Sequence, residues 1–171
     1  IKKEKVADAK FKYYKQLRLK QKRNADKKDY IKTSLATYKW ALQNFKTHAK
    51  ENDAYTILYE AAQMASRTFW TEDNMSQANK IVNESIKTLK KRSVAELLYI
   101  KGRIFEETKK ITEASAQYDL TIEDINTYRP KSLSFSMDRL FWVKAWIFYK
   151  DKKFAEAEKS FSDLADTSQD L

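Results

Sequence analysis

Apolar side chains recur every three or four positions along most of the chain, which is the spacing of one face of an α-helix. Between residues 29 and 49, for example, the apolar positions in step are Ile31, Leu35, Tyr38, Leu42 and Phe45. Short polar breaks separate eight such stretches, and Pro130 supplies the clearest break because proline cannot continue a helix. The pattern predicts helices over residues 3–23, 29–49, 53–70, 75–90, 94–109, 111–126, 133–150 and 153–166.

The composition supports an all-α fold. The 171 residues include 1 glycine and 1 proline, where average usage predicts about twelve and about eight. Sheets need glycine in hairpins and bulges, so long helices joined by short polar turns are the better fit. Turns this short make neighbouring helices antiparallel. We therefore expect about eight antiparallel helices in one domain of four pairs, spanning 3–49, 53–90, 94–126 and 133–166. Ser93 and Glu96 form a capping-box pattern at the start of the fifth helix.

Two of these pairs repeat one pattern at an offset of 43 residues. Small residues match small ones and large residues match large ones, in the pairs Leu98 with Phe141, Gly102 with Ala145, Phe105 with Phe148, Ala114 with Ala157 and Tyr118 with Phe161. The small residue lets two antiparallel helices approach closely, the alanine lies at their crossing, and the aromatic residues fill the space on either side. We predict that these ten residues are the repeat core. A single pair cannot bury both of its apolar faces, so the pairs must stack.

The spacing of small, alanine and aromatic positions resembles the tetratricopeptide repeat. The stretches "LYIKGRIFEETKKITEASAQYDLTI" and "FWVKAWIFYKDKKFAEAEKSFSDLA" both fit that family over about residues 94–166. Leu58, Ala62 and Ala78 match the repeat positions at 53–90 only if "FWTEDN" is an inserted turn. The period of 43 is longer than the family's, which is near 34, and "DKK" and "TKK" replace its turn glycine. The resemblance implies a right-handed solenoid of helix pairs.

A narrower resemblance is to the superhelical region of soluble lytic murein transglycosylases, carried by "RLFWVKAWIFYKDKKFAEAEKSF" and "RTFWTEDNMSQANKIVNESIKTL". It implies a periplasmic, non-catalytic scaffold that positions a separate catalytic domain on peptidoglycan. The chain begins at Ile1, and we expect it to be part of a longer protein. Glu84 and Ser85 imitate a catalytic pair, but they lie mid-helix without glycine-rich motifs, so we assign them no catalysis. The alternative is a freestanding adaptor, periplasmic or cytoplasmic, that binds a protein or peptide in its concave groove.

The excess positive charge is confined to the first third of the chain. Residues 1–50 hold 16 Lys or Arg against 4 Asp or Glu, whereas residues 51–171 hold 18 against 20. This segment is either a solvated face or a docking surface for an acidic partner. Its basic and aromatic residues interleave, but they match no nucleic-acid module, and we do not expect nucleic acid to be the partner. No apolar run is long enough to span a membrane.

Few residues could carry catalysis or hold a cofactor. The chain has no cysteine and one histidine, His48, which leaves carboxylates as the main metal ligands, and these form no calcium-loop pattern. A single glycine rules out phosphate-binding loops. We predict no catalytic, metal or cofactor site, and no enzyme activity for this chain by itself.

The first helix of each pair lines the concave face in this type of repeat. The candidate binding residues there are Tyr99, Arg103, Glu106, Arg139, Trp142, Trp146 and Tyr149. Trp142, Trp146 and Tyr149 follow one another at helical spacing and make one ridge. The ridge either packs on the helices predicted at 94–109 or 111–126 or on a repeat beyond Leu171, or it binds a ligand.

Overall fold

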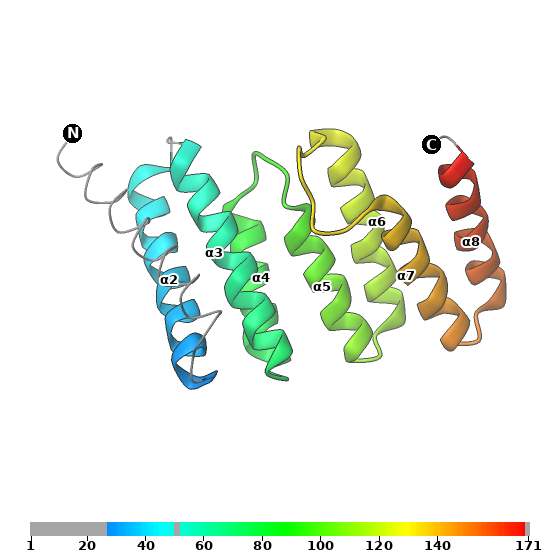
Figure 1. Ribbon diagram of the computed structural model, residues 1–171, viewed down its shortest axis with the longest axis horizontal. Helices are drawn as coiled ribbons and strands as arrows, with labels where there is room; N and C mark the ends of the chain where they lie inside the picture. The colour runs from blue at the N-terminus through cyan, green and yellow to red at the C-terminus, as the bar shows by residue number, and fades with distance from the viewer. Residues whose placement is uncertain (1–26, 50–51, 170–171) are drawn as a thin grey trace. The chain divides into compact units, whose positions relative to one another are not determined.

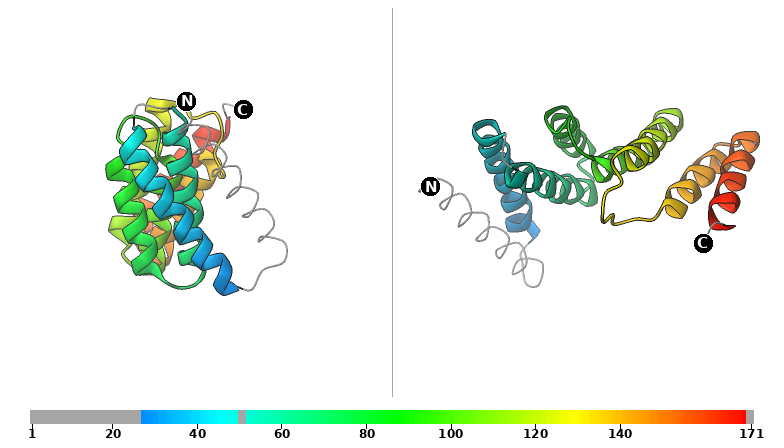
Figure 2. Two further views of the ribbon diagram at one scale, coloured as in Figure 1. Left: turned by 90° about the vertical axis from the view of Figure 1, so that its left-hand side faces the viewer. Right: turned by 90° about the horizontal axis from the view of Figure 1, so that it is seen from above.

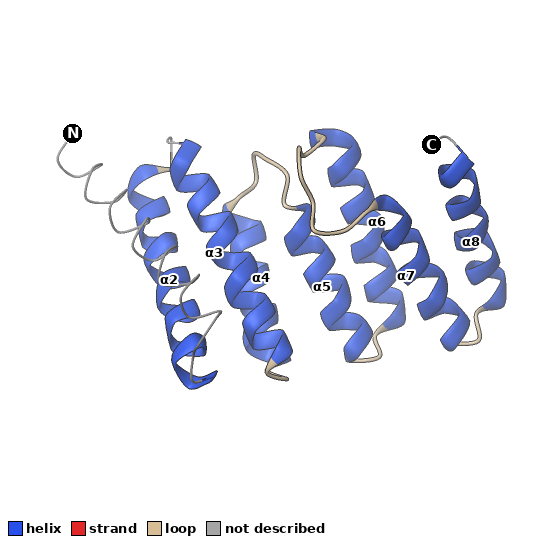
Figure 3. Cartoon of the chain, in the orientation of Figure 1, coloured by secondary structure: helices blue, strands red, loops and turns tan. Residues whose placement is uncertain are grey.

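A computed structural model describes residues 27–49 and 52–169 of the chain. Every regular element in these residues is an α-helix, so the described fold is all-α (Figures 1 and 3). The helices are α2 (Lys27–His48), α3 (Asn52–Thr71), α4 (Met75–Thr88), α5 (Ala95–Glu107), α6 (Ile111–Tyr128), α7 (Met137–Lys150) and α8 (Phe154–Gln169). The helix predicted at 3–23, and much of the basic first third, lie outside the described residues.

Most helix ends fall within three residues of their predicted positions, and the exception is the start of α7. It begins at Met137, four residues later than predicted, where the Ser136 side chain caps it by accepting the Arg139 N–H at 3.1 Å. α6 ends at Tyr128, and Arg129 adopts a left-handed conformation with φ 45° just before Pro130. Proline therefore stops the helix as expected, and the loop it opens is longer than the sequence pattern indicated.

The chain divides into two compact units, Ile1–Ser85 and Ile86–Leu171. In the first unit α2 packs along α3, where the hydroxyls of Ser34 and Thr68 lie 3.3 Å apart in the interface. Alanine dominates this core, with buried Ala41, Ala54, Ala61, Ala62, Ala65 and Ala78. Small side chains allow the helix backbones to approach closely.

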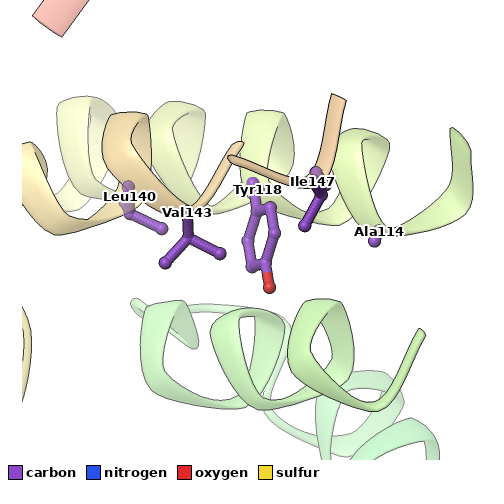
Figure 4. Close-up of a cluster of buried hydrophobic side chains, with 5 residues drawn as sticks. All are labelled: Ala114, Tyr118, Leu140, Val143 and Ile147. Atoms are coloured by element: carbon purple, nitrogen blue, oxygen red, sulfur yellow. The ribbon is translucent and has the colours of Figure 1, made fainter. Parts of the chain in front are cut away.

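The second unit consists of two helix pairs, α5 with α6 and α7 with α8, and α6 also packs on α7. The two members of each pair lie side by side in Figure 1 and in the top view of Figure 2. Between α6 and α7 lies a buried cluster made of Ala114, Tyr118, Leu140, Val143 and Ile147 (Figure 4). In this view the Tyr118 ring points away from its own helix, toward α5.

One turn geometry occurs three times, between α3 and α4, between α5 and α6, and between α7 and α8. A left-handed residue, Asp73, Lys109 or Lys152, has φ of 59°, 58° or 60°. Its N–H bonds to the carbonyl three residues back, and the next N–H bonds to the carbonyl five residues back, at 2.8–3.0 Å. This is the Schellman motif, which satisfies the last carbonyls of a helix. Lysine or aspartate thus holds the position that usually takes glycine.

The three turns also align the flanking sequences. The carbonyl that accepts the second of these bonds belongs to Phe69, Phe105 or Phe148. In the helix after each turn, Ala78, Ala114 or Ala157 donates its N–H to the carbonyl four residues back. Phe69 precedes Phe105 by 36 residues without an inserted turn. The position of Gly102 therefore corresponds to Ser66, which is fully buried, and not to Ala62, whose assignment required an inserted turn.

Candidate interaction face

Gly102 and Tyr118 set the distance between α5 and α6. Tyr118 is fully buried, and a Cβ placed on Gly102 would lie 2.4 Å from its ring carbon Cε1. The ring therefore occupies the space that any larger residue at position 102 needs. Burial, reinforced by the nearby carboxylate of Glu106, raises the pKa of the Tyr118 hydroxyl far above its ordinary value. The ring of Tyr118 is thus the group that approaches Gly102 closely.

The three candidate binding residues on α5 make contacts within the second unit. Tyr99 stacks on Phe135 with ring centres 4.3 Å apart, and its ring lies 5.9 Å from that of Tyr118. Arg103 forms an ion pair with Glu106 at 2.9 Å. Glu106 also accepts the Tyr118 hydroxyl at 3.0 Å. All three side chains are half-buried and take part in these contacts, and Arg103 and Glu106 also line a surface groove.

The equivalent face of α7 and α8 carries five aromatic residues in mutual contact, which we call the aromatic ridge: Trp142, Trp146, Tyr149, Phe154 and Phe161. Neighbouring rings meet edge to face. Ring centres lie 5.7 Å apart for Trp142 and Trp146, 5.3 Å for Trp146 and Tyr149, and 5.7 Å for Tyr149 and Phe154. Phe161 contacts Trp142 at 6.1 Å. Edge-to-face pairs at these distances are favourable, so the ridge is an ordered surface.

Four of the five side chains of the aromatic ridge are exposed, so within the described residues of the second unit the ridge is not packed on α5 or α6. Packing on a repeat beyond Leu171 stays a prediction. Trp142 is 39% exposed and Trp146 37%, with Tyr149 at 51% and Phe154 at 59%. Their ring contacts among the described residues are with each other and with Phe161. Arg139, the remaining candidate on α7, is exposed as well. The structure thus brings the candidates on α7 together with Phe154 and Phe161 of α8.

α7 packs on α6 through a stripe that belongs neither to the predicted repeat core nor to the aromatic ridge. The most buried side chains on this face are Leu140, Val143 and Ile147, each 3% exposed or less. Phe141 and Phe148, predicted as core, are half-buried, and Ala145 is fully buried. The i, i+3, i+7 spacing of Leu140, Val143 and Ile147 is present in the sequence, but the repeat pattern assigns the neighbouring aromatic residues to the core instead. The remaining repeat-core positions are buried at Leu98, Ala114 and Ala157 and half-buried at Phe105 and Phe161.

Two buried carboxylates tie helix ends to distant segments of the second unit. Asp124 on α6 accepts the Ser93 hydroxyl at 2.5 Å and the Val94 N–H at 3.0 Å. Glu96, 4% exposed, accepts the hydroxyl of Ser134 at 2.7 Å and also its N–H. Val94 is the N-cap, without a side-chain cap of its own, and the Ser93 hydroxyl of the predicted capping box accepts the Ala95 N–H at 3.4 Å. Both carboxylates hold the loops that precede α5 and α7.

The Glu84–Ser85 pair is part of the packing of the first unit. Tyr38 on α2 donates its hydroxyl to Glu84 at 2.8 Å, and Ser85 donates to the carbonyl of Ile81 at 2.7 Å. Burial raises the pKa of the Tyr38 hydroxyl well above its ordinary value. Both residues of the pair thus take part in hydrogen bonds of the first unit. Among the described residues no three His, Cys, Asp or Glu side chains converge on a possible metal site.

A surface groove of about 490 Å³ lies at the turn end of the second unit. Its lining consists of three cations, three anions and two isoleucines: Arg103, Lys109, Lys150, Glu106, Glu107, Asp151, Ile111 and Ile147. The mixture of both charge signs selects no particular ligand. None of the described helices combines the length and the apolar character that a membrane crossing requires.

Comparison of the chain with family models, curated proteins and solved structures finds no match. The resemblances to tetratricopeptide repeats and to lytic transglycosylases therefore stay predictions.

Proposed function

We propose that this chain is a helical-repeat adaptor that binds another protein through the aromatic ridge. The observation that carries the proposal is the exposure of four adjoining aromatic side chains on an ordered helix pair. An aromatic side chain has roughly 150–250 Å² of surface to bury, so the exposed fractions amount to on the order of 400 Å² of contiguous aromatic surface. Patches of about 300–600 Å² are the largest on a typical monomer and are often functional.

We further propose that the helix pairs stack as a right-handed solenoid similar to tetratricopeptide repeats. Support comes from the three equal turns and from the phenylalanine and alanine that flank each turn at fixed distances. Each pair leaves an apolar face that only another pair or a partner can cover. A solenoid of this kind displays side chains from successive pairs and has no need of a catalytic centre.

The narrower hypothesis of a peptidoglycan-associated scaffold has no structural observation of its own. Its test is the gene, which should encode a signal peptide before Ile1 and a glycine-rich catalytic domain after Leu171. The concave-groove version of the adaptor is weakened by the internal contacts of Tyr99, Arg103 and Glu106. The aromatic ridge is therefore the better candidate surface.

A capture experiment with matched variants tests the proposed function. The immobilised full-length chain is exposed to a lysate of its source, beside a Trp142→Ser/Trp146→Ser variant. The matched control is Leu120→Ser/Tyr128→Ser, which removes two exposed apolar residues from α6 at 44% and 45% exposure. Circular dichroism melts verify that all three fold. We expect a partner retained by the wild-type and control chains and lost by the ridge variant. Equal capture by the ridge variant would contradict the proposal.

A further inference from the structure

The aromatic ridge is the counterpart of a surface that the chain itself covers. An offset of 43 residues aligns α5–α6 with α7–α8, so Tyr99, Ile111 and Tyr118 correspond to Trp142, Phe154 and Phe161. The equivalent ring pairs have nearly equal spacing, 5.9 Å for Tyr99 with Tyr118 and 6.1 Å for Trp142 with Phe161. The two surfaces are thus alike in position and in ring spacing.

On α5–α6 this surface packs against a helix. Tyr99 and Ile111 pack on the buried cluster in which Tyr118 meets Leu140, Val143 and Ile147 of α7. These three aliphatic residues follow an i, i+3, i+7 stripe, and this stripe is the part of α7 that the interface needs. The corresponding surface on α7–α8 has no helix on it among the described residues of the second unit, and its ridge residues are exposed.

At two aligned positions of the first helices the charged residues of the two pairs differ in sign. Arg139 and Lys150 of α7 occupy the positions that Glu96 and Glu107 hold in α5. Within the described part of the chain, neither Arg139 nor Lys150 has a side-chain ion pair. An occupant with carboxylates at its edges therefore complements the α7 side of the ridge.

We propose that the aromatic ridge binds an acidic amphipathic α-helix of a partner protein, which presents aliphatic side chains at i, i+3 and i+7 and docks as α7 docks on α5–α6. This inference rests on the proposed adaptor function and names the chemistry of its partner. A second copy docked through its own ridge is a poorer occupant, because it brings the same two cations, Arg139 and Lys150, to the interface.

The size of the ridge sets the expected affinity. Stable interfaces bury about 800 Å² on each partner, and the exposed ridge provides on the order of half of that. The helix therefore gains the remainder from its flanks and from Arg139 and Lys150. We expect a dissociation constant in the range of about 1–100 μM for one isolated helix.

Three labelled peptides of about eighteen residues serve as probes. The first carries Leu, Val and Ile at i, i+3 and i+7 with glutamates at the edges, on an alanine background. The second has the same composition with the aliphatic residues spread around the helix, and the third has lysine in place of glutamate. A lactam bridge on the far face of each keeps the peptides helical, because short helices are marginal in water. Fluorescence anisotropy follows their titration with the full-length chain.

We expect the acidic stripe peptide to bind at least tenfold more tightly than the spread peptide and the lysine peptide. Trp142→Ser/Trp146→Ser should weaken its binding at least tenfold, and Leu120→Ser/Tyr128→Ser should leave it unchanged. Arg139→Glu/Lys150→Glu should reverse the preference between the acidic and lysine peptides. Binding to the spread peptide as tight as to the stripe peptide, or binding that survives loss of both tryptophans, overturns the inference.

Two further outcomes separate this inference from the proposed function. If a lysate partner depends on the ridge but the stripe peptide shows no saturable binding up to ~1 mM, the helix inference fails and the adaptor function stands. If neither the lysate nor the peptides contain a ridge-dependent ligand, both fail. A ridge-dependent dimer in sedimentation analysis makes a second copy the occupant and overturns the partner helix.

Discussion

The helix pairs α5–α6 and α7–α8 share a turn and a spacing, yet they differ at the positions that face outward. Arg103 and Glu106 form an ion pair on α5, whereas the equivalent Trp146 and Tyr149 on α7 form an edge-to-face aromatic contact. Tyr118 is fully buried, and its equivalent Phe161 is half-buried. The difference shows that the same helix-pair scaffold can bury its aromatic residues or display them. Burial is decided by whether a neighbouring helix covers the pair.

The largest expected effect contrasts the two equivalent aromatics of the second helices. Tyr118→Ala should lower the free energy of unfolding by about 3–5 kcal/mol, because a fully buried aromatic is deleted from the cluster with Leu140, Val143 and Ile147. Phe161→Ala should cost about 1–2 kcal/mol, because part of its surface is already in water. Urea unfolding followed by circular dichroism measures both. Equal losses would show that the two pairs are covered alike.

A second prediction concerns the close approach at Gly102. Gly102→Ala should destabilise the fold by about 1–2 kcal/mol, since the clash with the Tyr118 ring outweighs the better helix propensity of alanine. In a Tyr118→Val background the same change should stabilise by about 0.5–1 kcal/mol, because the ring atoms are gone. At the equivalent position Ala145→Gly should cost about 1 kcal/mol. A double-mutant cycle in urea gives the sign, and a Gly102→Ala effect that ignores residue 118 contradicts the contact.

Alkaline pH should affect the two pairs differently through Tyr118. Burial raises the pKa of this hydroxyl in the folded chain, so above about pH 10 the unfolded chain loses the proton first. Stability conferred by the neutral phenol is therefore fully present below pH 10 and falls as pH rises, by up to about 1.4 kcal/mol per pH unit. Tyr38 contributes with the same sign.

Tyr118→Phe should make the fall in stability with rising pH less steep, because one of the two titrating buried tyrosines is removed. Urea unfolding at about pH 8 and about pH 11 measures the difference, with Tyr128→Phe, an exposed tyrosine on the same helix, as the matched control. An unchanged slope for Tyr118→Phe would place the alkaline sensitivity elsewhere.

The smallest expected effect concerns the left-handed turn residue that the two pairs share. Lys109→Gly and Lys152→Gly should each stabilise the fold by about 0.5–1 kcal/mol, because both lysines adopt φ near +60°, which glycine accepts without strain. Lys159→Gly, in the exposed middle of α8, should instead cost about 1 kcal/mol. Thermal melts compare the three. A loss of stability at Lys109 or Lys152 would mean that these side chains make contacts that the turn requires.

The sequence allowed prediction of the helices because their spacing is a local property. It left the alignment of the α3–α4 pair dependent on an inserted turn, because Ser66 takes a position at which the pattern expects alanine or glycine. It also missed the role of Glu96, whose partner Ser134 lies 38 residues away. The exposure of Trp142 and Trp146 could not be predicted from α7 alone, since a helix apolar on two faces reads the same whether the second face is covered or open.

The carboxylate of Asp124 has a consequence for the order in which the second unit folds. It accepts the N–H of Val94, the N-cap of α5, from the last turns of α6, 30 residues away. The N-terminus of α5 therefore lacks this hydrogen bond until α6 has formed. The two helices should form in one cooperative step, with the amide of Val94 exchanging its hydrogen only when the whole hairpin opens.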